Sequence, residues 1–444
     1  MVVKPTLRDV IVEILGFLPE AGEASSKLGK FAPGEWDLIL PWLDDAGLSL
    51  YFLGKLKESG AEDRIPKSAL AYLEANLGAN RCRVAYMERQ FVSLNQKLNA
   101  AGVKYAAVKG LALVPEFCAD ASLRHQSDFD YLVEEGSFPA AEHVVESGGY
   151  TLRQRKGPEA SFVMPAMGEA VGGPGQYEAH APHAVELHRA IWDGEFVKMF
   201  LPEPRFLERV AVREFQGTQF YTLRDEDTYL LQAIHVLGHI LTEWVRMSWL
   251  YEAAYFLSRR SGDSLLWDRF DVAAGADLRL REAAVIMTEL AANLFQAPIP
   301  ARIRTWGAEL RPPVRVWIEN YARRWLLGRN QLSDPGRFPT CALPIFLHQQ
   351  YAADAKARRR VVFRHLLPTW RLSQIAHRVK SKPSSAVKMD FRRRQRIFRR
   401  AVFRLAAGAY YLWEVPRWRW LNRASGGFAA SRLHKPRLPD CNNV

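Results

Sequence analysis

The stretch Leu123-Arg-His-Gln-Ser-Asp-Phe-Asp-Tyr-Leu-Val133 decides how this chain is interpreted. In an extended strand successive side chains point to opposite faces, so Asp128 and Asp130 share one face while Phe129 and Tyr131 share the other. Neighbouring carboxylates repel each other, and proteins place them together mainly where they share a proton or hold a cation. Mg²⁺ is the natural counter-charge, because it takes oxygen ligands and leaves room for water and substrate phosphates. The alternative interpretation is an edge strand with two solvated Asp residues.

Segments on both sides of this stretch alternate between strand and helix patterns. The patterns predict strands over residues 103–108, 128–133 and 184–188, and helices over residues 110–118 and 139–147. A Gly- and Pro-rich stretch over residues 155–178 predicts a long loop. The last of the three strands places Glu186 and His188 on one face, which adds a third carboxylate to the pattern.

Helical spacing also covers residues 5–100, 225–258 and 281–295. His235 and His239 have the i, i+4 spacing that can grip a metal, but the residues between them lack the Glu of a zinc protease. Packing or substrate contact is therefore the favoured interpretation of this pair. Together these patterns predict an α+β fold, in which a small mixed β-sheet is flanked by helical N- and C-terminal regions.

Composition indicates a globular protein of more than one domain. The chain has 444 residues, of which 48% are hydrophobic and 25% charged, so it is long enough to bury two or three cores. Its four cysteines lie far apart without a C-x-x-C pair, which favours a reduced, cytoplasmic compartment over zinc or disulfide chemistry. The sequence shows neither a charged leader with an apolar core nor a long apolar run, so we predict neither secretion nor a membrane span.

We place the domain boundaries at 1–100 for the helical N-terminal region, 101–192 for the core, 193–339 for a helical C-terminal domain and 340–444 for a basic tail. Residues 351–444 carry 23 Lys and Arg against four acidic residues, a net charge of +19, whereas residues 1–350 carry 38 against 44, a net charge of −6. Charge asymmetry of this size indicates a polyanionic surface as the partner of the tail.

The tail leaves three interpretations open. Residues 391–405 interleave Arg with apolar side chains, and Tyr and Trp residues follow. The most favoured interpretation is a solvated helix packed on the body of the protein. The second is a basic amphipathic helix that lies on the inner face of an anionic membrane, and the third, less favoured, is a contact with nucleic acid. The hexapeptide Thr340-Cys-Ala-Leu-Pro-Ile345 is what the end of a common sequencing adapter encodes, which gives the hypothesis that an assembly artefact misjoined the tail.

The order of motifs resembles that of the DNA-polymerase-β-like nucleotidyltransferase superfamily. It is more closely similar to a bacterial family of uncharacterised nucleotidyltransferases with the pattern K-G … R-x-x-x-D-x-D-x-L-V … E-x-H. The matching residues are Lys109, Gly110, Arg124, Asp128, Asp130, Leu132, Val133, Glu186 and His188. The resemblance covers roughly residues 30–260. The superfamily's usual Gly-Ser at the first turn is replaced here by Lys109-Gly110, as in the closer family.

The resemblance implies Mg²⁺-dependent transfer of a nucleoside monophosphate from an NTP to an unknown acceptor. A two-metal site would be held by Asp128, Asp130 and Glu186, which are also the expected catalytic residues, and Glu186 would help to deprotonate the acceptor. The acceptor could be a small molecule, a glycan or a protein.

The expected nucleotide-binding residues are Lys109, Gly110, Arg124 and His188. Lys109 or Arg124 would neutralise phosphate charge, and the amide of Gly110 would approach a phosphate closely. His188 would orient Glu186 or contact substrate, although a strand histidine hydrogen-bonded at a domain edge explains it equally well. The alternative function is a catalytically weak binding or regulatory module, either antitoxin-like or an accessory of polysaccharide or natural-product assembly.

Overall fold

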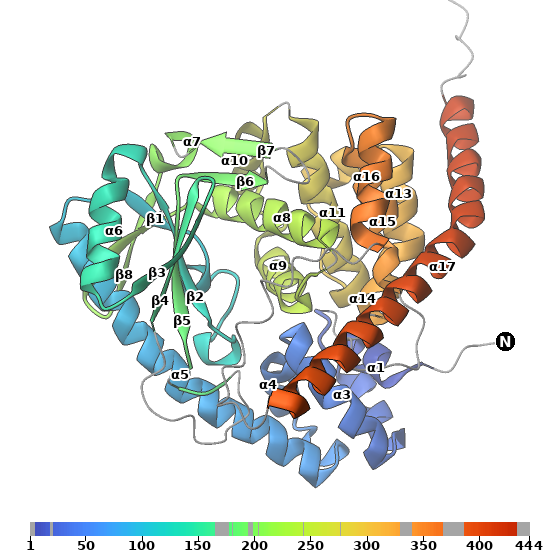
Figure 1. The fold of residues 1–444 in the computed structure, drawn as a ribbon, viewed down its shortest axis with the longest axis horizontal. Helices are drawn as coiled ribbons and strands as arrows, with labels where there is room; N and C mark the ends of the chain where they lie inside the picture. The colour runs from blue at the N-terminus through green and yellow to red at the C-terminus, as the bar shows by residue number, and fades with distance from the viewer. Residues whose placement is uncertain are drawn as a thin grey trace, which may run out of the picture. The chain divides into compact units, whose positions relative to one another are not determined.

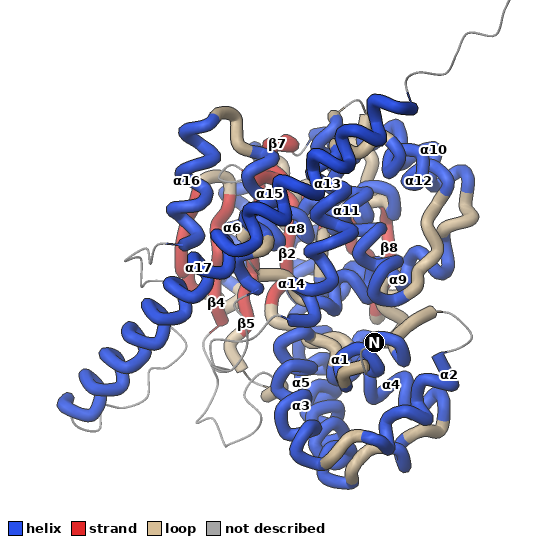
Figure 2. Tube along the Cα trace, turned by 90° about the vertical axis from the view of Figure 1, so that its right-hand side faces the viewer, coloured by secondary structure: helices blue, strands red, loops and turns tan. Residues whose placement is uncertain are grey.

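The computed structural model describes residues 5–17, 21–164, 177–179, 181–193, 199–202, 204–242, 244–275, 277–328, 340–366 and 386–432. The chain divides into two compact units. Unit 1 comprises Met1–Ile240 and Trp244–Ala308, and unit 2 comprises Leu241–Glu243 and Glu309–Val444. The strands belong to unit 1, as Figure 2 shows in red.

Unit 1 begins with helices, as the spacing of apolar residues over 5–100 predicts. They are α1 (Leu7–Ile14), α2 (Ala21–Ala24), α3 (Pro33–Ala46), α4 (Ser49–Ser59) and α5 (Lys67–Ala100). The first begins at a capping box, in which Thr6 and Asp9 satisfy each other's backbone N–H groups. The third and fourth each end at a glycine in the left-handed region, Gly47 with φ 71° and Gly60 with φ 60°.

A mixed sheet follows, whose seven described strands lie in the order β3-β4-β5-β2-β1-β9-β8. Their bounds are β1 (Tyr105–Ala107), β2 (Asp128–Val133), β3 (Thr151–Lys156), β4 (Glu159–Met164), β5 (His183–His188), β8 (Ala211–Phe215) and β9 (Thr218–Thr222). Strand β2 runs antiparallel to β1 on one side and parallel to β5 on the other. With helices on both sides of it, this sheet confirms the predicted α+β fold (Figure 1).

One face of the sheet carries the hydrophobic core. Phe129 and Tyr131 of β2 point to this face and pack against Phe91 of α5, with ring centroids 5.8 and 6.4 Å apart. Helix α6 (Phe138–Ser147) adds Val144 and Val145 to the same cluster. Because strand side chains alternate, burial of the odd-numbered residues of β2 turns Asp128 and Asp130 to the opposite face.

Three parts of the core region differ from expectation. The helix predicted over 110–118 is a single 3₁₀ turn, Gly110–Leu113, because Gly110 has φ 62° and Pro115 follows closely. The loop predicted over 155–178 includes the strand β4, and its residues 165–176 lie outside the described residues. Strands β8 and β9 extend the sheet to residue 222, past the boundary placed at 192, because β9 pairs in parallel with β1 at Ala107 and Thr222.

Helices complete unit 1. They are α7 (Pro204–Leu207), α8 (Asp225–Leu241), α9 (Met247–Arg260), α10 (Ser264–Ala274), α11 (Leu278–Phe295) and α12 (Ala301–Ala308). A separate strand pair, β6 (Ala190–Asp193) and β7 (Met199–Pro202), precedes them. The pattern predicted over 225–258 is thus two helices, α8 and α9, which Figure 1 shows on the side of the sheet away from α6.

Unit 2 is helical in its described residues. It contains α13 (Pro312–Trp317), the π-helical segment Ile318–Ala322, α14 (Arg323–Gly328), α15 (Pro344–His348), α16 (Ala355–Leu366) and α17 (Ala386–Arg432). The expected boundary at 340 falls inside a packed region, since Trp317 Nε1 donates a hydrogen bond to the Leu343 carbonyl at 3.0 Å and Phe346 packs on Tyr321 at 5.5 Å. Across the described part of the chain, every helix is too short or too polar to span a membrane.

Candidate functional site

Two neighbouring parallel strands position the polar side chains. In the register of β2 and β5, Asp130 lies opposite Glu186 and Leu132 lies opposite His188. The buried partners Val185 and Leu187 of β5 face the core, so Glu186 and His188 project from the other face of the sheet. Asp130 and Glu186 therefore form a direct cross-strand pair on the face of the sheet opposite the core.

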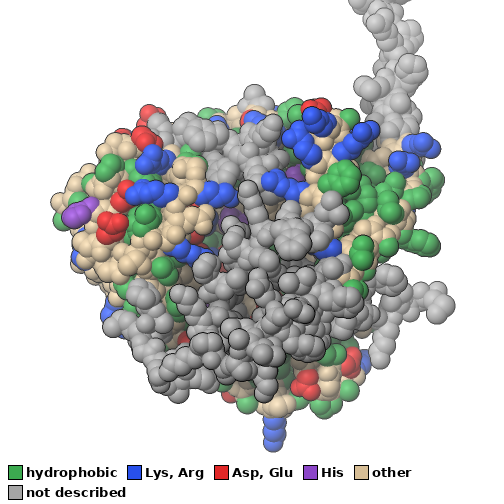
Figure 3. Space-filling model, in the orientation of Figure 1, with side chains coloured by type: hydrophobic (Ala, Val, Ile, Leu, Met, Phe, Trp, Pro, Cys, Tyr) green, Lys and Arg blue, Asp and Glu red, His purple; other side chains and the backbone are tan. Residues whose placement is uncertain are grey.

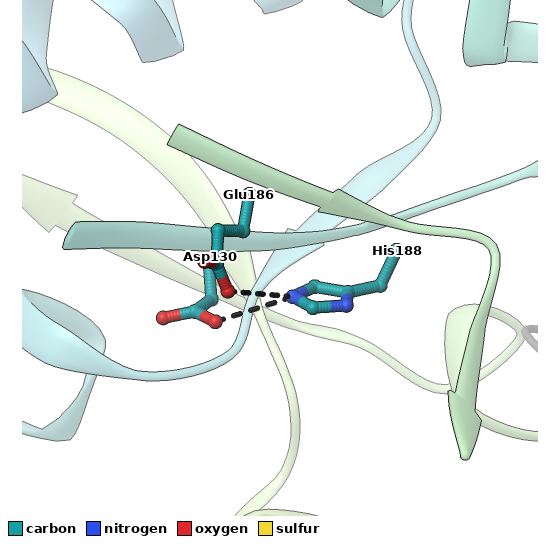
Figure 4. A group of neighbouring side chains, drawn as sticks. All are labelled: Asp130, Glu186 and His188. Atoms are coloured by element: carbon teal, nitrogen blue, oxygen red, sulfur yellow. Dashed lines mark hydrogen bonds and ion pairs between the residues drawn. The ribbon is translucent and has the colours of Figure 1, made fainter. Parts of the chain in front are cut away.

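Asp130, Glu186 and His188 form a compact group that could hold a metal ion (Figure 4). One ligand atom from each residue lies within 4.8 Å of the other two. The Nε2 atom of His188 is 3.2 Å from Asp130 Oδ1 and 3.9 Å from Glu186 Oε2. Two carboxylates and one imidazole suit a divalent cation, because carboxylate oxygens are ligands for Mg²⁺ and the added nitrogen suits Mn²⁺ or Zn²⁺ as well.

Lys109 reaches the same group from the turn after β1. Its Nζ lies 2.7 Å from Asp130 Oδ1, the oxygen that also contacts His188. Burial by itself would lower the pKa of Lys109, but the charges of Asp130 and Glu186 outweigh it and raise that pKa. Lys109 is thus a fixed cation, and its charge offsets that of a carboxylate whose side chain is only 2% exposed.

The two facing carboxyl groups have pKa values shifted in opposite directions. Burial would raise the pKa of Asp130, but the ammonium of Lys109 and the hydrogen bond from His188 hold that pKa below its ordinary value. Burial, together with the negative charges of Asp130 and Asp128, raises the pKa of Glu186 to about 7. The cluster therefore pairs a firmly ionised carboxylate with one that exchanges a proton near neutral pH.

Asp128 lies on the same face of β2 but outside the three-residue group. Its register partner on β5 is Ala184, which offers no polar side chain. Burial and the charge of Asp130 raise the pKa of Asp128, against the opposing fields of Lys109, Arg124 and Arg246. The structure therefore gathers Asp130, Glu186 and His188, and Asp128 lies outside this group on the same face of β2.

Arg124 is engaged by a buried carboxylate. Its Nε lies 3.0 Å from Glu252 Oε1 of α9, and its Nη1 donates to Gln126 Oε1 at 2.7 Å. The hydroxyl of Tyr51 donates to the same Glu252 oxygen at 3.1 Å. Only 13% of the Arg124 side chain is exposed. Arg124 thus links α9 to the segment that leads into β2, and the expectation that Lys109 or Arg124 neutralises phosphate charge stays a prediction.

Position 110 requires a glycine, both because of its backbone conformation and because a neighbouring side chain occupies the space of a Cβ atom. Its φ of 62° lies in the left-handed region, and a Cβ atom at this position would overlap the side-chain amide of Gln126. That amide donates to the Asp128 carbonyl, so the turn after β1 packs directly on the start of β2. This packing holds Lys109 at its distance from Asp130.

Several residues of the site escaped the sequence analysis. Gln126 and Glu252 support the motif from positions that no local pattern marks. Arg83 of α5 donates to the carbonyls of Gln126, Glu178 and Ala181 at 2.6, 2.9 and 3.2 Å, and so ties α5 to the entries of β2 and β5. Arg83 is only 2% exposed. The sequence pattern of α5 indicates its apolar positions, and it gives no signal that this arginine is buried and supports the site.

The comparisons with known proteins agree with this geometry. A family model described as an uncharacterised nucleotidyltransferase matches residues 32–296, which include α3 to α5, the seven-stranded sheet and α8 to α11. No curated protein and no solved structure matches the chain. Because the match spans more than half of the sequence, the chain belongs to this family of uncharacterised nucleotidyltransferases and is a transferase of phosphorus-containing groups.

Proposed function

We propose that this protein transfers a nucleoside monophosphate from an NTP to an acceptor, with Mg²⁺ bound at the carboxylates of β2 and β5. The observation that carries the proposal is the group formed by Asp130, Glu186 and His188, with Lys109 2.7 Å from Asp130. Carboxylates and a cation gathered on one sheet face suit a reaction in which charge moves between phosphate oxygens.

In the proposed reaction, an acceptor oxygen bonds to the α-phosphorus while the bond from that phosphorus to pyrophosphate breaks. Glu186 takes the proton of the acceptor, and His188 holds Glu186 in place through its contact at 3.9 Å. Asp130 and Glu186, with Asp128 next along β2, would hold the metal, which when bound polarises the phosphate oxygens and stabilises the departing pyrophosphate. Lys109 is close enough to neutralise phosphate charge once a cation takes its place beside Asp130.

Labelled nucleotides test the reaction. The full chain would be incubated with each α-labelled NTP, Mg²⁺ and a cell extract, and a labelled product or released pyrophosphate would be measured. Asp130→Asn and Glu186→Gln should each abolish transfer while the variants stay folded, and Asp268→Asn, at a side chain that is 70% exposed on α10, serves as the matched control. Wild-type protein that binds NTP without any transfer would instead favour the binding or regulatory module.

For the tail, an anionic membrane surface at the inner face of the cytoplasmic membrane is the proposed partner. Helix α17 exposes an apolar face formed by Val402, Leu405, Leu412, Trp413 and Trp420. Figure 3 shows hydrophobic side chains gathered over this part of unit 2, with Lys and Arg side chains beside them. Trp at a membrane interface and Arg near anionic lipid both favour such a contact.

Vesicle sedimentation tests the membrane contact without truncating the packed unit. The full chain should sediment with anionic vesicles, not with neutral ones, and salt should release it, because the Debye length shortens as ionic strength rises. Trp413→Ser with Trp420→Ser should weaken the binding, since these side chains are 79% and 67% exposed. Equal sedimentation with both lipids, or binding to nucleic acid alone, would contradict this assignment.

A further inference from the structure

An aromatic cluster spans α8, α9 and the connection between these two helices, outside the candidate metal site. It consists of His235, His239, Trp244 and Trp249, with neighbouring ring centroids 4.4 to 5.3 Å apart. The ring of Trp244 is the outer member, because this residue is 43% exposed, whereas His235, His239 and Trp249 are half-buried. The cluster thus presents a large aromatic surface to solvent on a rigid support of packed rings.

Helix α9 anchors this cluster beside the entry to β2. Glu252 forms the ion pair with Arg124, one turn after Trp249. Arg246, between the two Trp residues in sequence, has its Nη1 3.1 Å from His125 Nδ1. Residues 124 and 125 lead directly to Asp128, so the contacts of α9 hold the aromatic rings close to the carboxylate face of the sheet.

Helix α8 contributes His235 and His239 to the aromatic cluster. Burial lowers the pKa of His235 well below its ordinary value, and the charge of Lys109 lowers it further, so this imidazole is neutral. Gln232 shares a helix face with His235 and His239 by spacing. The Nε2 atom of Gln232 is buried and has no hydrogen-bond partner among the described residues, so a polar group is available beside the rings.

We infer that this aromatic cluster binds the nucleobase of the NTP, with the base stacked on Trp244. The inference rests on the proposed function, because it takes the triphosphate of the same NTP to lie at Asp130 and Lys109. Whatever the acceptor, the NTP carries a planar aromatic ring tied by one ribose to the α-phosphate. Every base has a π-face, so stacking on Trp gives affinity with little preference among bases.

Binding measurements with and without a base test this role. The dissociation constants of ATP, GTP, CTP, UTP and inorganic tripolyphosphate would be measured with Mg²⁺ on the full chain. Trp244→Ala should weaken binding of the NTPs by roughly 5- to 150-fold, the range that follows from stacking energies measured by alanine substitution, and leave tripolyphosphate binding unchanged. Trp244→Phe keeps a ring and should retain most of the affinity. Tyr221→Ala, at an aromatic residue of β9 that is 38% exposed, is the matched control.

The outcomes separate the inference from the proposed function. Wild-type protein that binds neither NTP nor tripolyphosphate contradicts the proposed function itself. Wild-type protein that binds both, with NTP affinity unchanged in Trp244→Ala, overturns only the stacking role and leaves the ring for an acceptor or for packing. Equal losses of NTP and tripolyphosphate affinity in Trp244→Ala would also overturn it, because they would show a general disturbance of the site.

Discussion

Replacing Lys109 by Met isolates the charge of Asp130. In the wild-type protein Lys109 Nζ lies 2.7 Å from Asp130 Oδ1, and the Asp130 side chain is 2% exposed. The Met side chain fills much of the same volume but leaves a buried carboxylate with His188 as its remaining close partner, at 3.2 Å. Removing one member of a buried ion pair typically costs about 3–5 kcal/mol. We expect the lower end, about 3 kcal/mol, since 20% of the Lys109 side chain is exposed.

A divalent cation should restore part of this stability. If Asp130, Glu186 and His188 bind a metal, the metal supplies the positive charge that Lys109→Met removes. A ligand at about 100 times its dissociation constant stabilises the folded state by about 2.7 kcal/mol. The wild type should gain less from the same metal, because Lys109 competes for the same oxygen of Asp130.

Denaturant unfolding in EDTA and in Mg²⁺ or Mn²⁺ measures both effects. Lys104→Met is the matched control, because the pair of Lys104 with Glu134 at 2.9 Å is exposed and worth about 0–1 kcal/mol. The double variant Lys109→Met, Asp130→Asn should be more stable than Lys109→Met alone, since the amide of Asn carries no charge that would need a buried partner. Wild-type stability of Lys109→Met in EDTA, or a metal effect no larger than in the wild type, would refute this reasoning.

Other perturbations test separate parts of the structure. Gly110→Ala should lower the free energy of unfolding by about 2–4 kcal/mol, because Ala is strained at a left-handed φ and its Cβ would overlap the side chain of Gln126. In denaturant unfolding, the double variant Gly110→Ala, Gln126→Ala should regain the part of the loss that comes from the overlap. Burial and the positive charge of Arg83 lower the pKa of His183 from 6.5 to about 4. As the pH falls, His183 therefore binds a proton in the unfolded chain at a higher pH than in the folded chain. The free energy of unfolding should therefore drop by about 3 kcal/mol between pH 6.5 and 4, and His183→Gln should remove this dependence. Re-amplification of the locus should show no adapter-like codons at residues 340–345, and recovering them would contradict the artefact hypothesis.

The strands of the site were predictable because their signals are local. The bounds of β2 match the predicted 128–133, and β5 begins one residue before the predicted 184. In both segments apolar residues alternate with polar ones, which is the pattern of a strand with one buried face. Such a pattern needs no information from distant parts of the chain.

The partners of the motif were not predictable, because they come from distant segments. Arg124 and Glu252 are 128 residues apart, and nothing near either residue marks the pair. The strand pair β8 and β9 joins the sheet through the pairing of Thr222 with Ala107, a residue far away in the sequence. A charged residue in a motif is therefore identified by sequence, whereas its use for packing or for phosphate depends on what folds against it.

The register of β2 and β5 explains why His188, and not Asp128, completes the cluster. Asp130 stands opposite Glu186, and both strands run in the same direction. Two residues further along β5, His188 can lean toward Asp130, whereas two residues earlier β5 offers only the methyl group of Ala184 opposite Asp128. Asp128 instead lies in the fields of Arg124 and Arg246. The carboxylate face thus differs along its length: Asp130 and Glu186 gather with His188 and Lys109 at one end, and Asp128 stands outside that group at the other.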